Sequence, residues 1–131
     1  MKIFFAPSAI LPGQSIPRTL SEALTASRHL LAVVTPSWLE SEWCRLEEEV
    51  ATWRDPAVKG RLLLPLLLKD CNLPPMLGRL QNVDFRQAST YEGSLREVVE
   101  AVRLGMRRAA EEHRTEYDRV TVLNSPIMPW L

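Results

Sequence analysis

Two runs of consecutive apolar residues constrain the fold of this 131-residue chain more than any other feature. The first extends from Leu30 to Val34 and the second from Leu62 to Leu68, and both are of strand length. A strand that is covered on both faces reads as a continuous apolar run, whereas a strand with one face in water alternates apolar and polar residues. The two runs therefore predict strands buried inside a parallel sheet. Pro65 within the second run is unusual there, because proline has no N–H to donate to a neighbouring strand.

Between these two runs, apolar residues recur at helical spacing. Trp43, Leu46, Val50 and Trp53 recur every three or four positions, which predicts a helix with this side buried. Weaker signals predict the remaining elements, namely strands at Ile3–Ala6 and Val83–Phe85, a first helix capped by Ser15, a loop or short helix at Leu73–Leu80, and a last helix from Ser94 to about Glu116. Such an alternation of strands and helices is typical of a parallel α/β fold.

Charge and cysteine content argue against several classes of protein. Basic and acidic residues number 16 each, so the concentrated basic face of a nucleic-acid-binding protein is not expected. Cys44 and Cys71 have neither metal-ligand spacing nor a disulfide framework, which favours buried or free thiols in a reducing compartment, with the cytoplasm as the default location. No apolar run approaches the roughly 20 residues of a membrane span. His29 and His113 have no partner nucleophile or metal spacing and are expected to be structural or exposed.

The segment Ser-Glu-Trp-Cys-Arg-Leu-Glu, residues 41–47, carries the main functional signal. Trp43 and Glu47 are four residues apart near the start of a predicted helix, so they would lie on the same helix face. This helix directly follows a predicted strand, and open α/β sheets bind ligands at the carboxyl ends of their strands. An aromatic ring beside a carboxylate at that point suits a nucleotide-sugar site. The simpler interpretation is a core tryptophan and one solvated glutamate in the run Glu47–Glu49.

Four motifs together resemble the Toll/interleukin-1 receptor (TIR) domain of the bacterial type. They are Ile-Leu-Pro-Gly-Gln-Ser-Ile at residues 10–16, Ser-Arg-His-Leu-Leu-Ala-Val-Val-Thr-Pro-Ser at 27–37, Trp-Cys-x-x-Glu within 41–47, and Leu-Leu-Pro-Leu at 63–66. Each motif is weak alone, but their order and spacing over residues 2–104 are fairly specific. The resemblance implies a flavodoxin-like parallel sheet flanked by helices, and it accounts for Pro65, because a proline in the fourth strand is common in this family.

The resemblance also implies an activity. Many bacterial and plant TIR domains hydrolyse NAD+ at the bond between nicotinamide and ribose, in cytosolic immune signalling and defence. It implies Glu47 as the catalytic carboxylate, with Trp43, Gly13 and Ser37 in the substrate site, NAD+ as substrate, and no cofactor or metal. The family usually needs self-association for activity, because a neighbouring subunit completes the pocket. Other TIR domains are therefore expected partners, alongside NAD+, with no nucleic acid and no membrane.

An inactive interaction module is the alternative function. In that hypothesis the loop with Leu11, Pro12, Gly13 and Ile16 docks onto another TIR domain and passes a signal without catalysis. Gly13 fits both functions, since it can supply a positive φ in a turn or permit a close approach to a nucleotide or subunit. Ser37 is also a candidate helix cap, in a capping box with Glu40.

The chain departs from the family at its start. A TIR domain begins with a strand and helix ahead of the segment found here, and that strand is central in the order 2-1-3-4-5. The domain, residues 1–117, is therefore expected to be N-terminally incomplete, as in a fragment or a truncated gene product. Strand Ile3–Ala6 would then pair directly with Leu30–Val34 or stay unpaired. Residues 118–131, with two prolines, are expected to form a tail or linker.

Overall fold

The computed structural model describes residues 2–6, 18–54, 60–112 and 119–124 of the chain. Along these residues strands and helices alternate, as the sequence predicts. The elements are β1 (Lys2–Ala6), α1 (Arg18–Thr25), β2 (Ser27–Val34), α2 (Pro36–Trp38), the π-helix η1 (Leu39–Trp43), α3 (Cys44–Trp53), β3 (Leu62–Leu67), α4 (Pro75–Gly78), β4 (Val83–Asp84), the 3₁₀-helix η2 (Ala88–Thr90), α5 (Tyr91–Glu111) and β5 (Arg119–Leu123).

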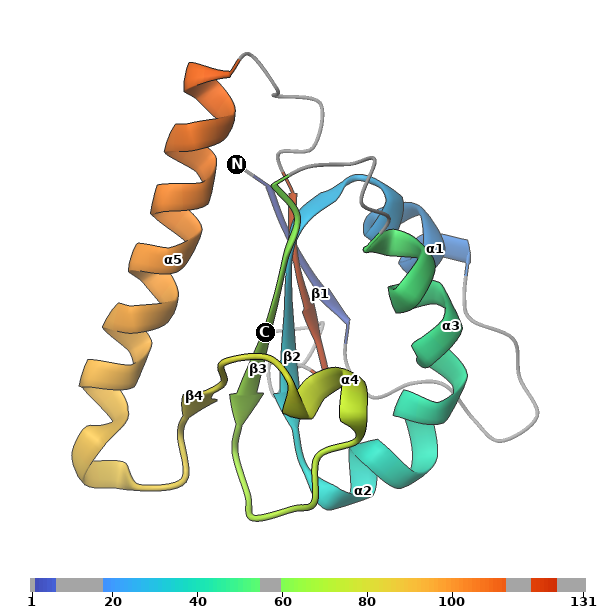
Figure 1. Cartoon of the computed structure of the whole chain (residues 1–131), viewed down its shortest axis with the longest axis vertical. Helices are drawn as coiled ribbons and strands as arrows, with labels where there is room; N and C mark the ends of the chain where they lie inside the picture. The colour runs from blue at the N-terminus through green and yellow to red at the C-terminus, as the bar shows by residue number, and fades with distance from the viewer. Residues whose placement is uncertain (1, 7–17, 55–59, 113–118, 125–131) are drawn as a thin grey trace.

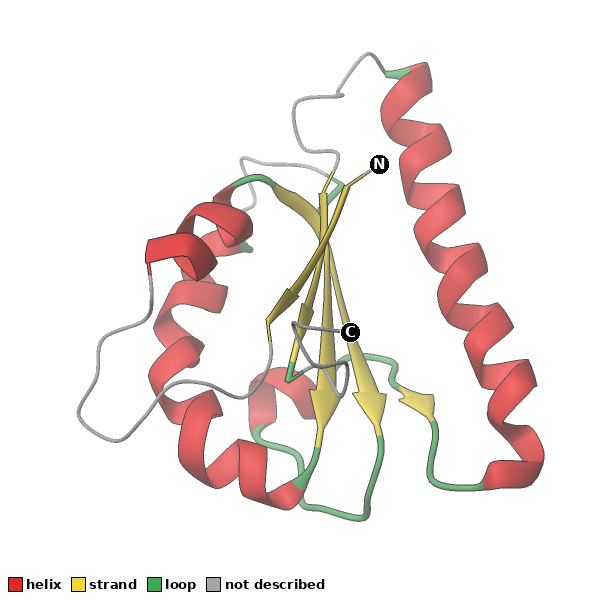
Figure 2. Ribbon diagram, turned by 180° about the vertical axis from the view of Figure 1, so that it is seen from behind, coloured by secondary structure: helices red, strands yellow, loops and turns green. Residues whose placement is uncertain are grey.

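The five strands form one sheet in the order β1-β5-β2-β3-β4, and every pair is parallel. Helices α1 and α3 lie on one side of the sheet and α5 lies on the other (Figure 1). The view from behind shows the same three layers (Figure 2). The predicted class, a flavodoxin-like parallel α/β fold, is confirmed.

The C-terminal strand β5 lies between β1 and β2. Ile3 pairs with Val120 on one side of β5, and Leu30 pairs with Thr121 on the other. The expectation that β1 pairs directly with β2, or with nothing, is therefore wrong. When β5 is counted as the first strand, the order becomes 2-1-3-4-5, the order of flavodoxin-like sheets. The central position that the N-terminus was expected to supply is filled from the other end of the chain.

This placement also corrects the predicted domain boundary. Residues 119–123 belong to the sheet, whereas the sequence analysis assigned 118–131 to a tail. The segment has only five residues and lies beyond the stretch that resembles the family, so its long-range pairing leaves no local signal. Pro126 and Pro129 lie outside the described residues.

Two apolar layers hold the sheet, one on each face. Leu30, Ala32 and Val34 of β2 belong to the layer under α1 and α3, while Leu31 and Val33 belong to the layer under α5. All eight residues of β2 are buried, which confirms a strand covered on both faces. The predicted buried helix side, which extends from the end of η1 along α3, is confirmed too, because its four members are at most 4% exposed. They are Trp43, Leu46, Val50 and Trp53.

Polar contacts near the amino end of β2 join this strand to β5 and to the carboxyl ends of α1 and α3. The hydroxyl groups of Ser27 on β2 and Thr121 on β5 lie 2.6 Å apart, and Ser27 Oγ also donates to the carbonyl oxygen of Ala23 at 2.5 Å. The Arg61 guanidinium donates to three carbonyl oxygens, those of Ser27, Trp53 and Thr25. The hydrogen bonds of the Arg61 guanidinium thus join α1, β2 and α3.

Pro65 and the last helix show smaller differences from expectation. Strand β4 pairs only with Leu66 and Leu67, so β3 has a ladder neighbour on one side at Pro65, where a proline is tolerated. Helix α5 begins at Tyr91 rather than Ser94, whose hydroxyl donates to the carbonyl oxygen of Asp84 at 2.6 Å. None of the described helices is long and apolar enough to cross a membrane.

Candidate functional site

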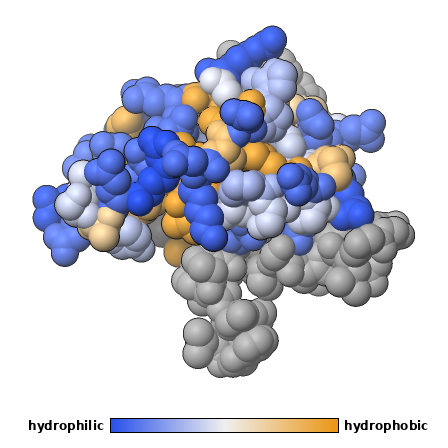
Figure 3. Space-filling view, turned by 90° about the horizontal axis from the view of Figure 1, so that it is seen from below, coloured by the Kyte–Doolittle hydropathy of each residue, from blue (hydrophilic) through white to orange (hydrophobic). Residues whose placement is uncertain are grey.

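The carboxyl ends of the five parallel strands meet at the lower edge of the sheet in Figure 1. Helix α2 and the π-helix η1 follow β2 directly at this edge. Figure 3 views this edge from below and shows apolar side chains in the middle of the surface, with hydrophilic side chains around them. This is the edge at which open parallel sheets bind their ligands.

Thr35, rather than Ser37, caps the helix that follows β2. The Thr35 hydroxyl accepts a hydrogen bond from the backbone N–H of Trp38 at 3.3 Å, and Pro36 occupies the first helical position. Ser37 lies inside α2 and is exposed, so the predicted capping role belongs to Thr35. The Ser37 hydroxyl lies 3.4 Å from that of Thr35 and remains at the surface of this edge.

The indole of Trp43 lies in the core, where it packs on that of Trp38. The two ring centroids are 5.6 Å apart with a tilt of 44°, and Trp43 is 3% exposed. Trp43 is the last residue of the π-helix and directly precedes α3. A ring held in this position cannot stack on a ligand, so the structure favours the core interpretation of Trp43.

Glu47 is exposed in the first turn of α3. It is next to the buried Leu46, and the buried stripe of α3 fixes which side of the helix faces outward. Glu48 and Glu49 are exposed as well, so exposure alone does not distinguish Glu47 from its neighbours. Glu42, one residue before Trp43, is only 5% exposed, and the sequence analysis did not single it out. A charged residue between the polar Ser41 and a core tryptophan gives no sequence signal of burial.

Four predicted site residues cannot be placed. Leu11, Pro12, Gly13 and Ile16 all lie outside the described residues. Their assignment to a substrate site or an interaction loop therefore stays a prediction.

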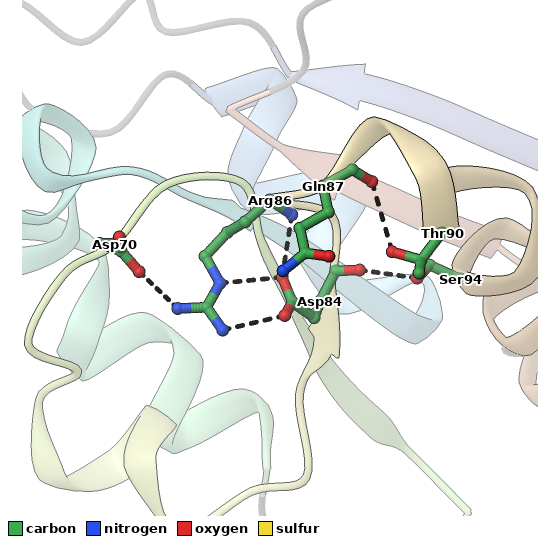
Figure 4. A network of polar contacts seen from close by, with 6 residues as sticks. All are labelled: Asp70, Asp84, Arg86, Gln87, Thr90 and Ser94. Atoms are coloured by element: carbon green, nitrogen blue, oxygen red, sulfur yellow. Dashed lines mark hydrogen bonds and ion pairs between the residues drawn. The ribbon is translucent and has the colours of Figure 1, made fainter.

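An ion-pair network that sequence reasoning missed closes the same edge (Figure 4). The Arg86 guanidinium donates to both carboxylate oxygens of Asp84 at 2.9 Å and also pairs with Asp70. These hydrogen bonds lower the pKa of Asp84 to about 2 and raise that of Arg86. Because the side chains are solvent-exposed, the network adds little stability. It connects the loop after β3 to the end of β4.

Asn124 is a second polar group at this edge. It follows β5 with φ of 54°, a left-handed conformation that asparagine tolerates better than most residues. Its side-chain Nδ2 donates to the carbonyl oxygen of Val33 at 2.8 Å, which joins the ends of β5 and β2. Among the described residues, no three His, Cys, Asp or Glu side chains are grouped so that they could hold a metal ion.

The fold and this edge define a flavodoxin-like α/β domain whose helix after the second strand presents a glutamate to solvent. Residues 1–99 match the model of the TIR domain family, which is more than half of the chain. The chain therefore belongs to the TIR domain family.

A curated human relative supports this assignment. The human Toll/interleukin-1 receptor domain-containing adapter protein is 33% identical over 93 residues, which cover 70% of this chain and 40% of the relative. The chain thus matches less than half of the length of that protein. No solved structure matches the chain.

Proposed function

We propose that this TIR domain hydrolyses NAD+ at the bond between nicotinamide and ribose, with Glu47 as the catalytic carboxylate. The observation that carries the proposal is the placement of Glu47. It is an exposed carboxylate in the first turn of α3, the helix that continues from α2 and η1 after the carboxyl end of β2. The side chain is already exposed, so a ligand can reach this carboxylate without any rearrangement of the core.

One carboxylate is sufficient for this chemistry. Nicotinamide leaves as a neutral molecule from a cationic glycoside, so no general acid has to protonate it. The sugar passes through a transition state that resembles an oxocarbenium ion, as in other glycoside hydrolysis. The carboxylate of Glu47 would stabilise this positive charge and orient the ribose hydroxyl groups before water attacks.

Trp43 has a positioning role in this account. Its ring is packed on Trp38 in the core and so anchors the start of α3, which carries Glu47. Binding of the planar rings of NAD+ is therefore assigned to residues other than Trp43. We further propose that the domain self-associates and that it is located in the cytoplasm. The free thiols of Cys44 and Cys71 support the second of these proposals, because thiols stay reduced in that compartment.

The test compares Glu47→Gln with Glu48→Gln at high protein concentration. Glu48 is the adjacent exposed glutamate of the same helix and serves as the matched control. The proposal predicts a loss of roughly 100-fold or more in NAD+ hydrolysis for Glu47→Gln, which is typical when a group that stabilises the transition state is removed. Glu48→Gln should stay within about twofold of the unchanged protein. Equal losses in both variants would argue for a general effect on helix α3.

A signalling module without catalysis is the second candidate. The human relative is an adapter protein by name, which favours this candidate. In this case the segment from Leu11 to Ile16 would dock onto a second TIR domain. Substitution of Pro12 or Gly13 by alanine should then abolish association in sedimentation, while Glu47→Gln should have no effect on association and the unchanged chain should leave NAD+ intact.

A further inference from the structure

Helix α5 has a row of exposed apolar side chains along one side. Tyr91, Leu95 and Val99 are between 38% and 49% exposed, and each is four residues from the next. Residues at this spacing lie one above the other on a helix, so the three form a continuous surface, which we call the α5 stripe. Single exposed apolar residues are normal on a protein surface, whereas a contiguous group of them marks an interaction site.

The α5 stripe lies on the side of the helix that faces away from β3 and β4. The opposite side of α5 borders a cavity of about 640 Å³ at the amino ends of β2 and β3, whose wall includes Ala101, Leu104 and Arg108 of α5 and His29 of β2. The buried row with Val98 and Val102 runs between these two sides of the helix. The stripe therefore points over the part of the sheet formed by β5 and β1.

No described helix lies beside α5 on this part of the sheet (Figure 1). Ile3 of β1 pairs with Val120, which belongs to the layer under α5, so neighbouring side chains of the two strands share that face. Val120 is buried but Ile3 is exposed. Within the described residues, the α5 stripe thus has no covering partner.

Charged residues accompany the α5 stripe in a definite order. Glu92 stands at its beginning, and Arg103 continues the row one turn beyond its end. Arg96 and Glu100 lie between them on the solvent side. All four side chains are exposed, and none has an ion-pair or hydrogen-bond partner among the described residues. The stripe is therefore bordered by an acidic group at one end and a basic group at the other.

This order of charges is complementary to itself when a second copy of α5 packs in the antiparallel direction. In a two-fold pair, residue i of one copy contacts residue j of the other, and j contacts i. With the two-fold axis near the middle of the stripe, Leu95 meets Val99 of the second copy. Glu92 then meets Arg103 of the second copy, and Arg96 meets Glu100, so opposite charges face each other. A parallel pair would place every charge against its own copy, which is repulsive.

We propose that two copies of this domain associate through the α5 stripe, with their α5 helices antiparallel. This inference rests on the self-association that is proposed above, and it names the surface. The Tyr91 ring is held by an edge contact with Phe85, at 5.3 Å between centroids, and its free face can receive the Arg103 guanidinium of the second copy. Because the contact involves one helix from each copy, it is smaller than the roughly 1,000 Å² of stable complexes, and the pair should form only at high protein concentration.

Charge-reversal variants test this surface by sedimentation velocity. Glu92→Arg and Arg103→Glu each place like charges opposite one another at both symmetric contacts. If one such contact changes the affinity about threefold, either variant should weaken self-association about tenfold. An equimolar mixture of the two variants should restore it, because both contacts of the mixed pair then join opposite charges. A mixture that associates no better than either variant alone would overturn the proposal.

Glu97→Arg and Arg108→Glu are the matched controls. Both residues are exposed on the other side of α5, where they line cavities next to β3. Each control variant should change self-association less than twofold. Equal weakening by the controls and by the stripe variants would indicate a nonspecific effect of charge and contradict the assignment.

The same measurement separates this surface from the rest of the proposed function. It contains no NAD+, so its outcome does not depend on hydrolysis. If the unchanged chain associates and the stripe variants associate equally well, the α5 surface is wrong while self-association stands. If the unchanged chain stays monomeric in the millimolar range, as expected when a different partner covers the stripe, both the surface and the proposed self-association are wrong.

Discussion

The imidazole of His29 on β2 occupies the space that a methyl group would need at Gly105 on α5. An added Cβ at position 105 would lie 2.2 Å from Nε2 and 2.6 Å from Cε1 of this ring. A glycine inside a helix ordinarily weakens the helix by about 1 kcal/mol relative to alanine. Here the glycine permits close approach of α5 to the amino end of the sheet, and that approach shapes the cavity.

Gly105→Ala should destabilise the protein, although alanine is the better helix former. Forcing a methyl group into an occupied site typically costs about 1–3 kcal/mol. Gly93→Ala on the same helix is the control, because a Cβ there meets nothing within 4 Å, and it should stabilise by about 0.5–1 kcal/mol. Urea unfolding of both variants measures the two effects. The interpretation fails if Gly105→Ala is as stabilising as Gly93→Ala.

The low pKa of His29 predicts a loss of stability in mild acid. The pKa is about 4 in the folded protein, against an ordinary value of 6.5. The unfolded chain therefore binds a proton below pH 6.5 that the folded protein takes up only near pH 4. The free energy of unfolding is therefore unaffected by His29 above pH 6.5. It decreases as the pH falls toward 4, by about 3 kcal/mol in total.

His29→Leu separates this titration from the other charges around the cavity. Arg28, Arg61, Arg108 and Glu112 stay in place in this variant. The difference in unfolding free energy between the unchanged protein and His29→Leu should shift in favour of the variant as the pH falls from 6.5 to 5. A difference that does not vary with pH over this range would show that His29 has an ordinary pKa.

Strand β5 should be essential to the fold. Strand β1 pairs only with β5 in the described sheet, and Thr121 of β5 is fully buried with its hydroxyl 2.6 Å from that of Ser27. Deletion of residues 119–131 should therefore give an unfolded or insoluble chain. Deletion of 125–131 alone is the comparison, and circular dichroism with thermal melting is the measurement. If the two truncated chains melt at the same temperature, β5 does not hold the sheet together.

Two substitutions at Trp43 distinguish a core residue from a ligand platform. Trp43→Ala should cost about 3–5 kcal/mol, because the indole is 3% exposed and packs on Trp38. Trp43→Phe keeps a ring in the core and should leave the KM for NAD+ within about threefold, since a side chain held in the core adds no contact to the substrate. A tenfold rise in KM with unchanged stability would instead show that the indole contacts the substrate.

Local patterns were sufficient to predict much of the fold. The apolar run of Leu30–Val34 is buried on both faces, and the helical spacing from Trp43 to Trp53 gives the buried side of α3. These signals are local because the residues of each run or stripe are close together in the sequence and are buried as parts of one element. The family assignment also follows from short motifs at fixed spacing, and residues 1–99 match the family.

Long-range contacts were not predictable in this way. Strand β5 pairs Thr121 with Leu30, some 90 residues earlier, and no local pattern reports such a pairing. His29 packs against Gly105 because α5 lies close to β2. The sequence around either residue does not predict this contact. At the carboxyl edge, Arg86 joins Asp84 and Asp70 across two loops, a contact that appears only when β3 and β4 lie side by side.

The most direct test of the proposed activity is a time course of NAD+ followed by chromatography. It compares the unchanged chain with Glu47→Gln and Glu48→Gln at matched high concentration, after circular dichroism has shown that all three are folded. The account predicts that NAD+ declines and nicotinamide accumulates with the unchanged chain and with Glu48→Gln, while Glu47→Gln is at least 100-fold slower. Undiminished turnover by Glu47→Gln, or no turnover by the folded, self-associated unchanged chain, would contradict it.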